Sequence, residues 1–144
     1  MTVSSKELIS VGLVVGIIGI MALGDVKSGA ETTPAHSQAA EDYLTLHALP
    51  RPDIAFTHDG CTLMPDTLPW HDFTEACLMH DIAYWAGGPD RLRFKADLNF
   101  LRALSDSGIL GQFPASQVAY AAVRVFGDSA LTKKLGAHWG YGWE

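Results

Sequence analysis

The sequence predicts a small, mainly α-helical domain that follows an N-terminal membrane signal or anchor helix. Three segments carry apolar residues at helical spacing between capping residues and glycines, and we find no convincing pair of strands beside them. A chain of 144 residues suits one domain. We place the signal or anchor in residues 1–24, a linker with a possible short helix in residues 25–56, and the helical domain in residues 57–144.

The first element is an apolar run from Leu8 to Leu23 without a charged residue. As a signal peptide, it has Lys6 before it and a small-x-small end at residues 22–24. As a retained anchor, it would span about 24 Å, which is short for a hydrocarbon core about 30 Å thick. We weigh the two interpretations equally. Both predict an extracytoplasmic protein, either secreted or anchored to a membrane by residues 8–23.

The charge of the chain restricts its partners. The net charge is −6 and no basic cluster is present, which argues against binding to nucleic acid. An acidic protein also gains no long-range attraction to anionic lipid, so it would reach a membrane through apolar contacts or its anchor. Gly12 and Gly16 form a GxxxG pair, a weak pattern for helix pairing in membranes that leaves the oligomeric state open.

Between the apolar run and the domain, the composition changes. Residues Asp25–Ala40 are rich in Gly, Ser, Thr, Ala and Glu, which is typical of a flexible linker. Ala39–Leu46 could form a short helix. Pro50 and Pro52 then favour extended chain, and further prolines predict irregular structure up to Trp70.

Four helices are expected in the domain, each bounded by a capping residue or a glycine. They are Phe73–Ala86, Asp90–Ser105, Pro114–Phe126 and Ser129–Leu135. Asp72 and Glu75 have the spacing of a capping box at the first helix, and Gly87 with Gly88 marks its end. The buried face of the second helix is expected at Phe94, Leu98, Leu101 and Leu104.

The chemistry is concentrated on the first of these helices. Cys77, His80, Asp81 and Tyr84 stand at i, i+3, i+4 and i+7, which places them on one face. Asp97 lies inside the apolar stripe of the second helix and therefore needs donors, which His80 and Tyr84 would supply. A His–Asp pair fixes the imidazole tautomer and raises its basicity. The pattern thus predicts His80 as a general base that Asp97 orients.

The cysteines suggest what lies beside this face. Cys61 and Cys77 are the only two, and an oxidising compartment favours a disulfide between them. The bond would hold residues 59–61 against the helix, where Asp59 and the Gly60 carbonyl could face Asp81. Carboxylates with a backbone carbonyl form a hard oxygen site that suits Ca²⁺ better than Zn²⁺.

The segment Cys77–Tyr84 resembles the C-x-x-H-D-x-x-Y helix of secreted phospholipases A2. Asp59-Gly60-Cys61 is similar to the calcium-loop segment of the short bacterial and fungal branch, in which the corresponding cysteines pair. Asp97 resembles the second-helix Asp of that family, and residues 120–127 resemble its closing helix. The resemblance covers about half of the chain. The glycine-rich calcium loop of the animal enzymes is absent.

This resemblance implies two antiparallel active-site helices and calcium-dependent hydrolysis of the sn-2 ester of glycerophospholipids in a membrane. It implies catalytic roles for His80, Asp97 and Tyr84. Calcium would be held by Asp59, Gly60 and Asp81. The tail, Trp139–Trp143, is similar to that of uncharacterised bacterial membrane-associated proteins with an HD-x-x-Y-W-x-G-G helix.

Two alternatives remain open. The domain could be a non-catalytic, membrane-associated binding module that keeps the His–Asp network for stability. The order His58, His80-Asp81, Asp97 also matches HD-type metal phosphohydrolases, provided that His58 points inward. Otherwise His58 is expected to be exposed or locally bonded, as are His36, His47, His71 and His138.

The aromatic residues near the helices give two further expectations. Trp70 and Trp85, with Leu63 and Met64, flank the expected site and could touch acyl chains. The aromatic tail could lie at a membrane interface or fold back on the helices.

Overall fold

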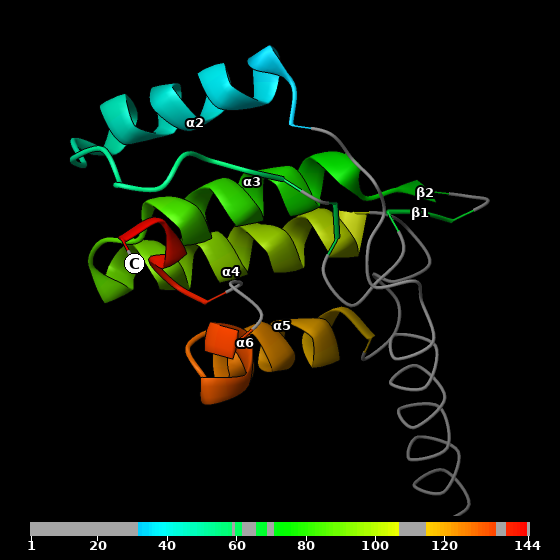
Figure 1. The fold of residues 1–144 in the computed structure, drawn as a ribbon. Coiled ribbons are helices and arrows are strands. Elements are labelled where there is room, and N and C mark those ends of the chain that lie inside the picture. Colours follow the sequence, from blue (N-terminus) through cyan, green and yellow to red (C-terminus); the bar gives the residue numbers. More distant parts are fainter. Residues whose placement is uncertain are drawn as a thin grey trace, which may run out of the picture.

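The computed structural model describes residues 32–58, 60–61, 66–68, 71–106, 115–134 and 138–143. The elements in chain order are α2 (Pro34–His47), β1 (Thr67–Leu68), β2 (His71–Asp72), α3 (Thr74–Ala86), α4 (Asp90–Asp106), α5 (Ala115–Phe126), α6 (Ala130–Lys134) and the 3₁₀ turn η2 (Tyr141–Trp143). The mainly helical class is confirmed (Figure 1).

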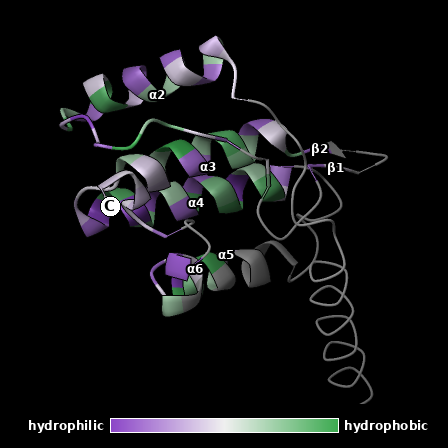
Figure 2. Ribbon diagram, viewed as in Figure 1, coloured by the Kyte–Doolittle hydropathy of each residue, from purple (hydrophilic) through white to green (hydrophobic). Residues whose placement is uncertain are grey.

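An antiparallel pair of helices, α3 and α4, forms the middle of the fold. Helix α2 lies on one side of this pair, and α5 lies on the other (Figure 1). The turn η2 packs against α3. Helix α3 is apolar along much of its length, whereas polar and apolar residues alternate around α2 (Figure 2). A helix covered by several neighbours needs such an apolar surface, and one that covers a single side does not.

The glycine end predicted for α3 is confirmed, but the capping box predicted at Asp72 and Glu75 is not, because Phe73 is the N-cap residue and no side chain caps it. An Asp72 carboxylate oxygen instead accepts a hydrogen bond at 2.8 Å from the backbone N–H of Thr74, the first residue of the helix. The helix ends at Gly87, whose φ of 65° is open to glycine. A Cβ atom there would also lie 2.8 Å from the Cα of Gly140. Gly87 therefore both ends the helix and admits the C-terminal segment.

The linker prediction is wrong for residues 34–40, because α2 begins at Pro34. Thr33 caps this helix: its hydroxyl accepts from the backbone N–H of His36, and the His36 side chain accepts from the N–H of Thr33. Proline is tolerated in the first turn because the backbone N–H that it lacks would have no partner within the helix there. Ala40 and Leu44 are buried against α3 residues. The helix is stabilised by its cap and by tertiary packing. The sequence did not indicate it, because the small and polar residues of this segment are also typical of a linker.

A short strand pair also departs from the sequence expectation. Thr67 pairs with Asp72, and Leu68 pairs with His71, in antiparallel register. Each strand has only two residues, so there is no room for the alternation by which a strand is recognised. The pair directs the chain into the start of α3.

The buried face of α4 matches the prediction at Leu104 and differs from it at Phe94, Leu98 and Leu101. Its buried residues are Leu92, Asp97, Phe100 and Leu104. Phe94 is 49% exposed, and the guanidinium of Arg124 lies 5.6 Å from its ring centroid. An aromatic ring that stacks with a cation can stay at the surface. Counting Phe94 with the core was therefore wrong.

Three tryptophans, one on α3 and two in the C-terminal segment, donate hydrogen bonds to backbone carbonyls. Trp85 is 1% exposed and donates its indole N–H to the carbonyl of Ile54 at 2.7 Å. The expectation that Trp85 touches acyl chains is therefore wrong. Trp143 donates to the carbonyl of Ala86 at 2.9 Å, and Trp139 donates to that of Gly88 at 3.1 Å. The tail folds back on α3, which was one of its two predicted positions.

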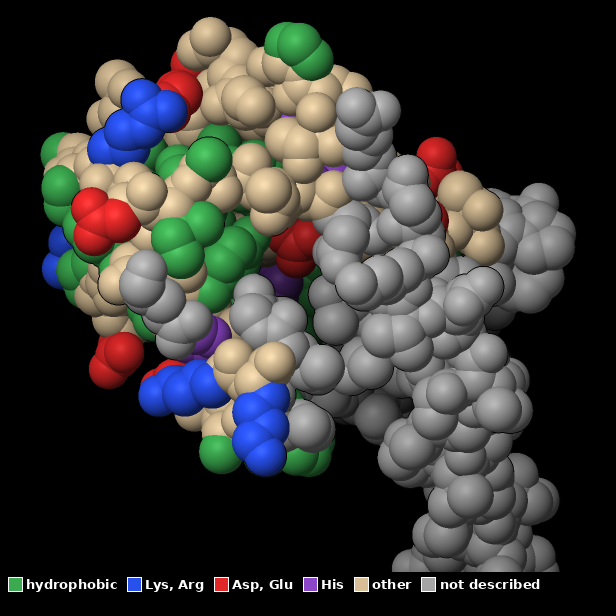
Figure 3. Space-filling model, in the orientation of Figure 1, with side chains coloured by type: hydrophobic (Ala, Val, Ile, Leu, Met, Phe, Trp, Pro, Cys, Tyr) green, Lys and Arg blue, Asp and Glu red, His purple; other side chains and the backbone are tan. Residues whose placement is uncertain are grey.

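The predictions for Leu8–Leu23, Leu63, Met64 and Trp70 lie outside the described residues. Among the helices that the structure does describe, none has both the length and the apolarity needed to cross a bilayer. On the face shown in Figure 3, hydrophobic side chains gather over the α3–α4 layer, and the cationic side chains stand at its margins.

Candidate functional site

The three predicted catalytic residues meet between α3 and α4. The Nε2 atom of His80 lies 3.0 Å from Oδ1 of Asp97. The Tyr84 hydroxyl donates to the same oxygen at 2.8 Å and is 3.3 Å from the carbonyl of Val123. The Asp97 side chain is fully buried, while that of His80 is 11% exposed. The predicted contacts are therefore present, and a buried carboxylate holds a histidine at the edge of solvent.

The structure adds a partner that the sequence prediction missed. Arg124 of α5 donates to Oδ2 of Asp97 at 2.9 Å. A signal was available, since Arg124 is the only charged residue of α5. A cation in an otherwise apolar helix needs an anion nearby, and Asp97 was the buried carboxylate in need of donors. The Asp97 carboxylate of α4 thus accepts from three side chains, two on α3 and one on α5.

Charges in this network are stabilised by one another. Burial raises the pKa of Asp97, but hydrogen bonds from His80, Arg124 and Tyr84 outweigh it and leave this pKa below its ordinary value. The hydrogen bond with Asp97 raises the pKa of Arg124. Burial raises the pKa of Tyr84 well above its ordinary value. Asp97 is therefore an anion and Tyr84 a neutral donor at neutral pH.

The orientation of the His80 ring is fixed on several sides. Its centroid lies 4.3 Å from that of Tyr84 and 4.7 Å from that of Phe100. Because Nε2 faces a carboxylate, this nitrogen carries the proton. Nδ1 is then the basic nitrogen, and it makes no hydrogen bond with any of the residues that the structure describes. His80 thus meets the geometric requirements of a general base.

His80 stands in the wall of an open cleft of about 520 Å³ between α2, α3 and α4. Much of the lining is apolar and includes Leu46, Ala76, Met79 and Phe100. Leu46 is 78% exposed and Met79 is 43% exposed. The lining also includes polar side chains, among them His47, Asp72, Glu75, Lys95 and Asn99. A mostly apolar cleft with a few polar groups is the usual form of a site for a small ligand.

A second His–Asp pair involves Asp81, the residue that follows His80 on α3. His58 is buried, and its Nδ1 atom lies 3.0 Å from Oδ2 of Asp81. The expectation of an exposed or locally bonded His58 is therefore wrong. Nothing in the spacing of His58 pointed to Asp81, because the two are 23 residues apart and belong to different elements.

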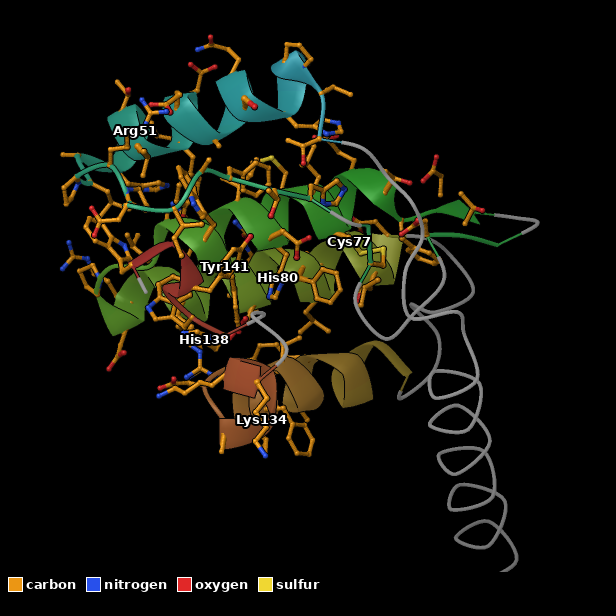
Figure 4. All side chains as sticks on the ribbon, in the orientation of Figure 1. Arg51, Cys77, His80, Lys134, His138 and Tyr141 are labelled. Carbon is orange, nitrogen blue, oxygen red and sulfur yellow. A yellow bond between two sulfur atoms is a disulfide. The ribbon has the colours of Figure 1, made fainter. Side chains whose placement is uncertain are left out.

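The disulfide between Cys61 and Cys77 is present, as predicted. Cys77 lies one helical turn before His80 on α3 (Figure 4). Residues 58 and 61 are thus both tied to α3, one through Asp81 and the other through Cys77. Gly60 between them is buried and has a φ of 89°, which few other residues adopt.

Three residues were predicted to hold calcium, and the structure describes two of them. Asp81 lies on α3 with its side chain 21% exposed, and Gly60 belongs to the segment tied beside it. Asp59 lies outside the described residues. Within the described ranges, no group of three His, Cys, Asp or Glu side chains could hold a metal. The described donors are the Asp81 carboxylate and the Gly60 carbonyl, and both are oxygen atoms of the kind that Ca²⁺ binds.

Comparisons with family models, with curated proteins and with solved structures gave no match to this chain.

Removal of the Arg124 side chain should loosen the network. Arg124→Met takes a charged hydrogen bond from a buried carboxylate, so we expect the free energy of unfolding to fall by about 1.5–3 kcal/mol. Chemical denaturation followed by circular dichroism measures this change. Arg91→Met is the matched control, since Arg91 is exposed on α4. Equal stability of the two variants would show that Arg124 contributes nothing through Asp97.

Acid should destabilise the fold through Asp97. The pKa of Asp97 in the folded protein is below its unfolded value of about 3.9, so its contribution is complete above that pH. The contribution is lost as the pH falls through the lower folded-state pKa. In Arg124→Met, the folded-state pKa is expected to be higher, so the loss should begin at a higher pH. Urea midpoints measured between pH 7 and pH 2 test this. Superimposable pH profiles would contradict it.

The disulfide should contribute to stability chiefly by restricting the unfolded chain. Its cysteines are separated by 16 residues, for which the chain-entropy relation gives about 3 kcal/mol. We expect the variant with Ser at Cys61 and Cys77 to lose about this amount in denaturant titrations. Intact-mass analysis before and after reduction provides the covalent check. Two free thiols in protein recovered from its native compartment would contradict the bond.

Proposed function

We propose that this protein hydrolyses the sn-2 ester of glycerophospholipids in a calcium-dependent reaction. The observation that carries the proposal is the position of His80. Its Nε2 atom is held by a buried carboxylate, and its ring forms part of the wall of an apolar cleft. The resemblance of the Cys77–Tyr84 segment to secreted phospholipases A2 points to the same chemistry.

In the proposed reaction, Nδ1 of His80 accepts a proton from water while the water oxygen attacks the ester carbonyl carbon. Asp97 stabilises the resulting imidazolium and keeps the ring in place, assisted by Tyr84 and Arg124. His80 then returns the proton to the leaving glycerol oxygen as the carbon–oxygen bond breaks. The products are a free fatty acid and a lysophospholipid.

Asp81, Asp59 and the Gly60 carbonyl are the proposed calcium ligands. Bound calcium would supply positive charge for the oxyanion that develops on the ester carbonyl. The protein's own part is to hold these oxygens near His80, which Asp81 achieves by following it directly on α3. The disulfide holds the Gly60 segment to the same helix.

The cleft supports a lipid substrate. Its apolar walls suit an acyl chain, and the exposed side chains of Leu46 and Met79 would meet apolar material outside it. Since the chain is acidic, these contacts and the N-terminal segment are the expected means of reaching a membrane.

We further propose an extracytoplasmic location, with residues 8–23 as a cleaved signal or an anchor. The Cys61–Cys77 disulfide supports it, because such bonds persist in oxidising compartments. N-terminal sequencing of the native protein distinguishes the two forms. A start near Asp25 would indicate secretion, and an intact N-terminus in the membrane fraction would indicate an anchor. Full-length soluble protein in the cytoplasm with reduced thiols would contradict the location.

The direct test is fatty-acid release from phospholipid vesicles by the purified full-length chain. Release is expected with Ca²⁺ and not with EDTA. A shortened version must begin before Thr33, because a start at Ala40 would remove half of α2. A folded protein that binds vesicles without releasing fatty acid under either condition would instead support the non-catalytic binding module.

The inward position of His58 is the one observation that favours the HD-type phosphohydrolase. That mechanism places both His58 and His80 on a metal ion. In the structure, Nε2 of His80 is held by Asp97 and Nδ1 of His58 is held by Asp81. Tight Mn²⁺ or Fe²⁺ binding that is lost in both His58→Ala and His80→Ala would support the phosphohydrolase over the phospholipase.

A further inference from the structure

His58 occupies a position that the proposed reaction does not explain. Its side chain is fully buried, whereas that of Asp81 is 21% exposed. Nδ1 of His58 lies 3.0 Å from Oδ2 of Asp81. A carboxylate accepts, so this ring nitrogen donates. The buried partner thus fixes one oxygen of a carboxylate that lies nearer to solvent.

The surroundings of His58 hold its ring in place. Its backbone N–H donates to the Thr32 hydroxyl at 2.7 Å. The ring stacks on Phe56, with an interplanar angle of 13°, and meets the edge of His36. Thr32 directly precedes the N-cap of α2 and His36 lies in its first turn, so the start of this helix supports the ring from outside the α3–α4 pair. A side chain fixed on this many sides can orient its partner.

The two consecutive residues of α3 are held in the same manner. His80 is held by Asp97 of α4, and Asp81 is held by His58 of the segment before the disulfide. A His–carboxylate contact therefore orients each of them. In metal sites, such outer partners fix the rotation of the ligating group, and their loss typically weakens metal binding by 10–100-fold.

We propose that His58 is the positioning residue of the calcium site. By donating from Nδ1 to Oδ2, it fixes the rotation of the Asp81 carboxylate in the orientation that binds Ca²⁺. This inference rests on the proposed function, because it takes Asp81 as a calcium ligand. A purely structural His58 would stabilise the fold without changing the affinity for calcium.

Three substitutions of His58 distinguish the effect of its hydrogen-bond donor from the effect of its ring packing. His58→Asn places an amide N–H near the position of Nδ1, whereas His58→Gln places it near that of Nε2. His58→Phe keeps the ring that stacks on Phe56 and removes the donor. Calcium affinity is measured by titration calorimetry on the full-length chain in detergent, with CaCl₂ as the only ligand. Asp81→Asn is the reference for loss, and His47→Asn is the control for a histidine elsewhere.

We expect His58→Asn to bind calcium within about threefold of the wild type, and His58→Gln and His58→Phe to bind 10–100-fold more weakly. If His58→Phe does not fold, the comparison of Asn with Gln decides the matter. Wild-type affinity in folded Gln and Phe variants would overturn the positioning role alone. An equal loss in folded Asn and Gln variants would also overturn it. Absence of calcium binding by the wild type would overturn both this inference and the calcium dependence of the proposed function.

Discussion

Replacement of His80 by Gln is expected to lower fatty-acid release by about 10²–10⁴-fold, the usual contribution of a general base. Glutamine keeps a polar side chain beside Asp97 but cannot accept a proton from water. The fold should persist, because Asp97 retains its bonds to Tyr84 and Arg124. The measurement is the initial rate of release from vesicles at saturating Ca²⁺, with melting curves to confirm folding.

His47→Gln is the matched control for this experiment. His47 lines the same cleft from α2, and no hydrogen bond joins it to Asp97. A general effect of removing a histidine from the cleft would lower release in both variants. A large loss confined to His80→Gln supports the proposed base. Unchanged release by His80→Gln would refute the mechanism.

The core of the site could be predicted because it depends on helical spacing. Cys77, His80 and Tyr84 share a face of α3, and Asp97 falls inside an apolar stripe of α4. A buried carboxylate needs donors, so local periodicity and one electrostatic requirement together predicted the contacts that the structure shows.

The missed contacts depend on tertiary structure. His58 reaches Asp81 across 23 residues, and Arg124 reaches Asp97 across 27. Neither spacing follows a helical or strand period, although the single charge of α5 did indicate that Arg124 needs an anionic partner. The start of α2 supports His58, and the packing of α5 against α4 brings Arg124 to Asp97. The beginning of α2 was missed for a related reason, since small polar residues there resemble a linker until Ala40 and Leu44 are seen to pack.

The second large effect is expected from Asp97→Asn, through the tautomer of His80. The carboxylate accepts from His80 and Tyr84 on Oδ1 and from Arg124 on Oδ2. An asparagine has one accepting oxygen, and Arg124 can only donate. The amide oxygen is therefore expected to turn toward Arg124, so that the NH₂ group faces His80. Nε2 must then accept, the ring proton moves to Nδ1, and the proposed base is lost.

We expect this substitution to lower fatty-acid release by up to about 10⁴-fold, as the wrong tautomer does in other His–Asp enzymes. Nitrogen NMR of the imidazole reports the tautomer directly and requires no activity, so it also applies to a non-catalytic domain. Asp106→Asn, an exposed carboxylate at the end of α4, is the control. A native tautomer with full release in Asp97→Asn would contradict the assignment.

The double variant Asp97→Asn with Arg124→Met gives the sharpest test of this argument. Without the guanidinium, the amide oxygen can turn back to accept from His80 and Tyr84. Nδ1 then regains its lone pair, and release should partly recover relative to Asp97→Asn alone. Two independent losses would instead add, which would make the double variant the poorer enzyme. Recovery of release together with the native tautomer would show that Arg124 acts on His80 through Asp97, and a further loss would show that it does not.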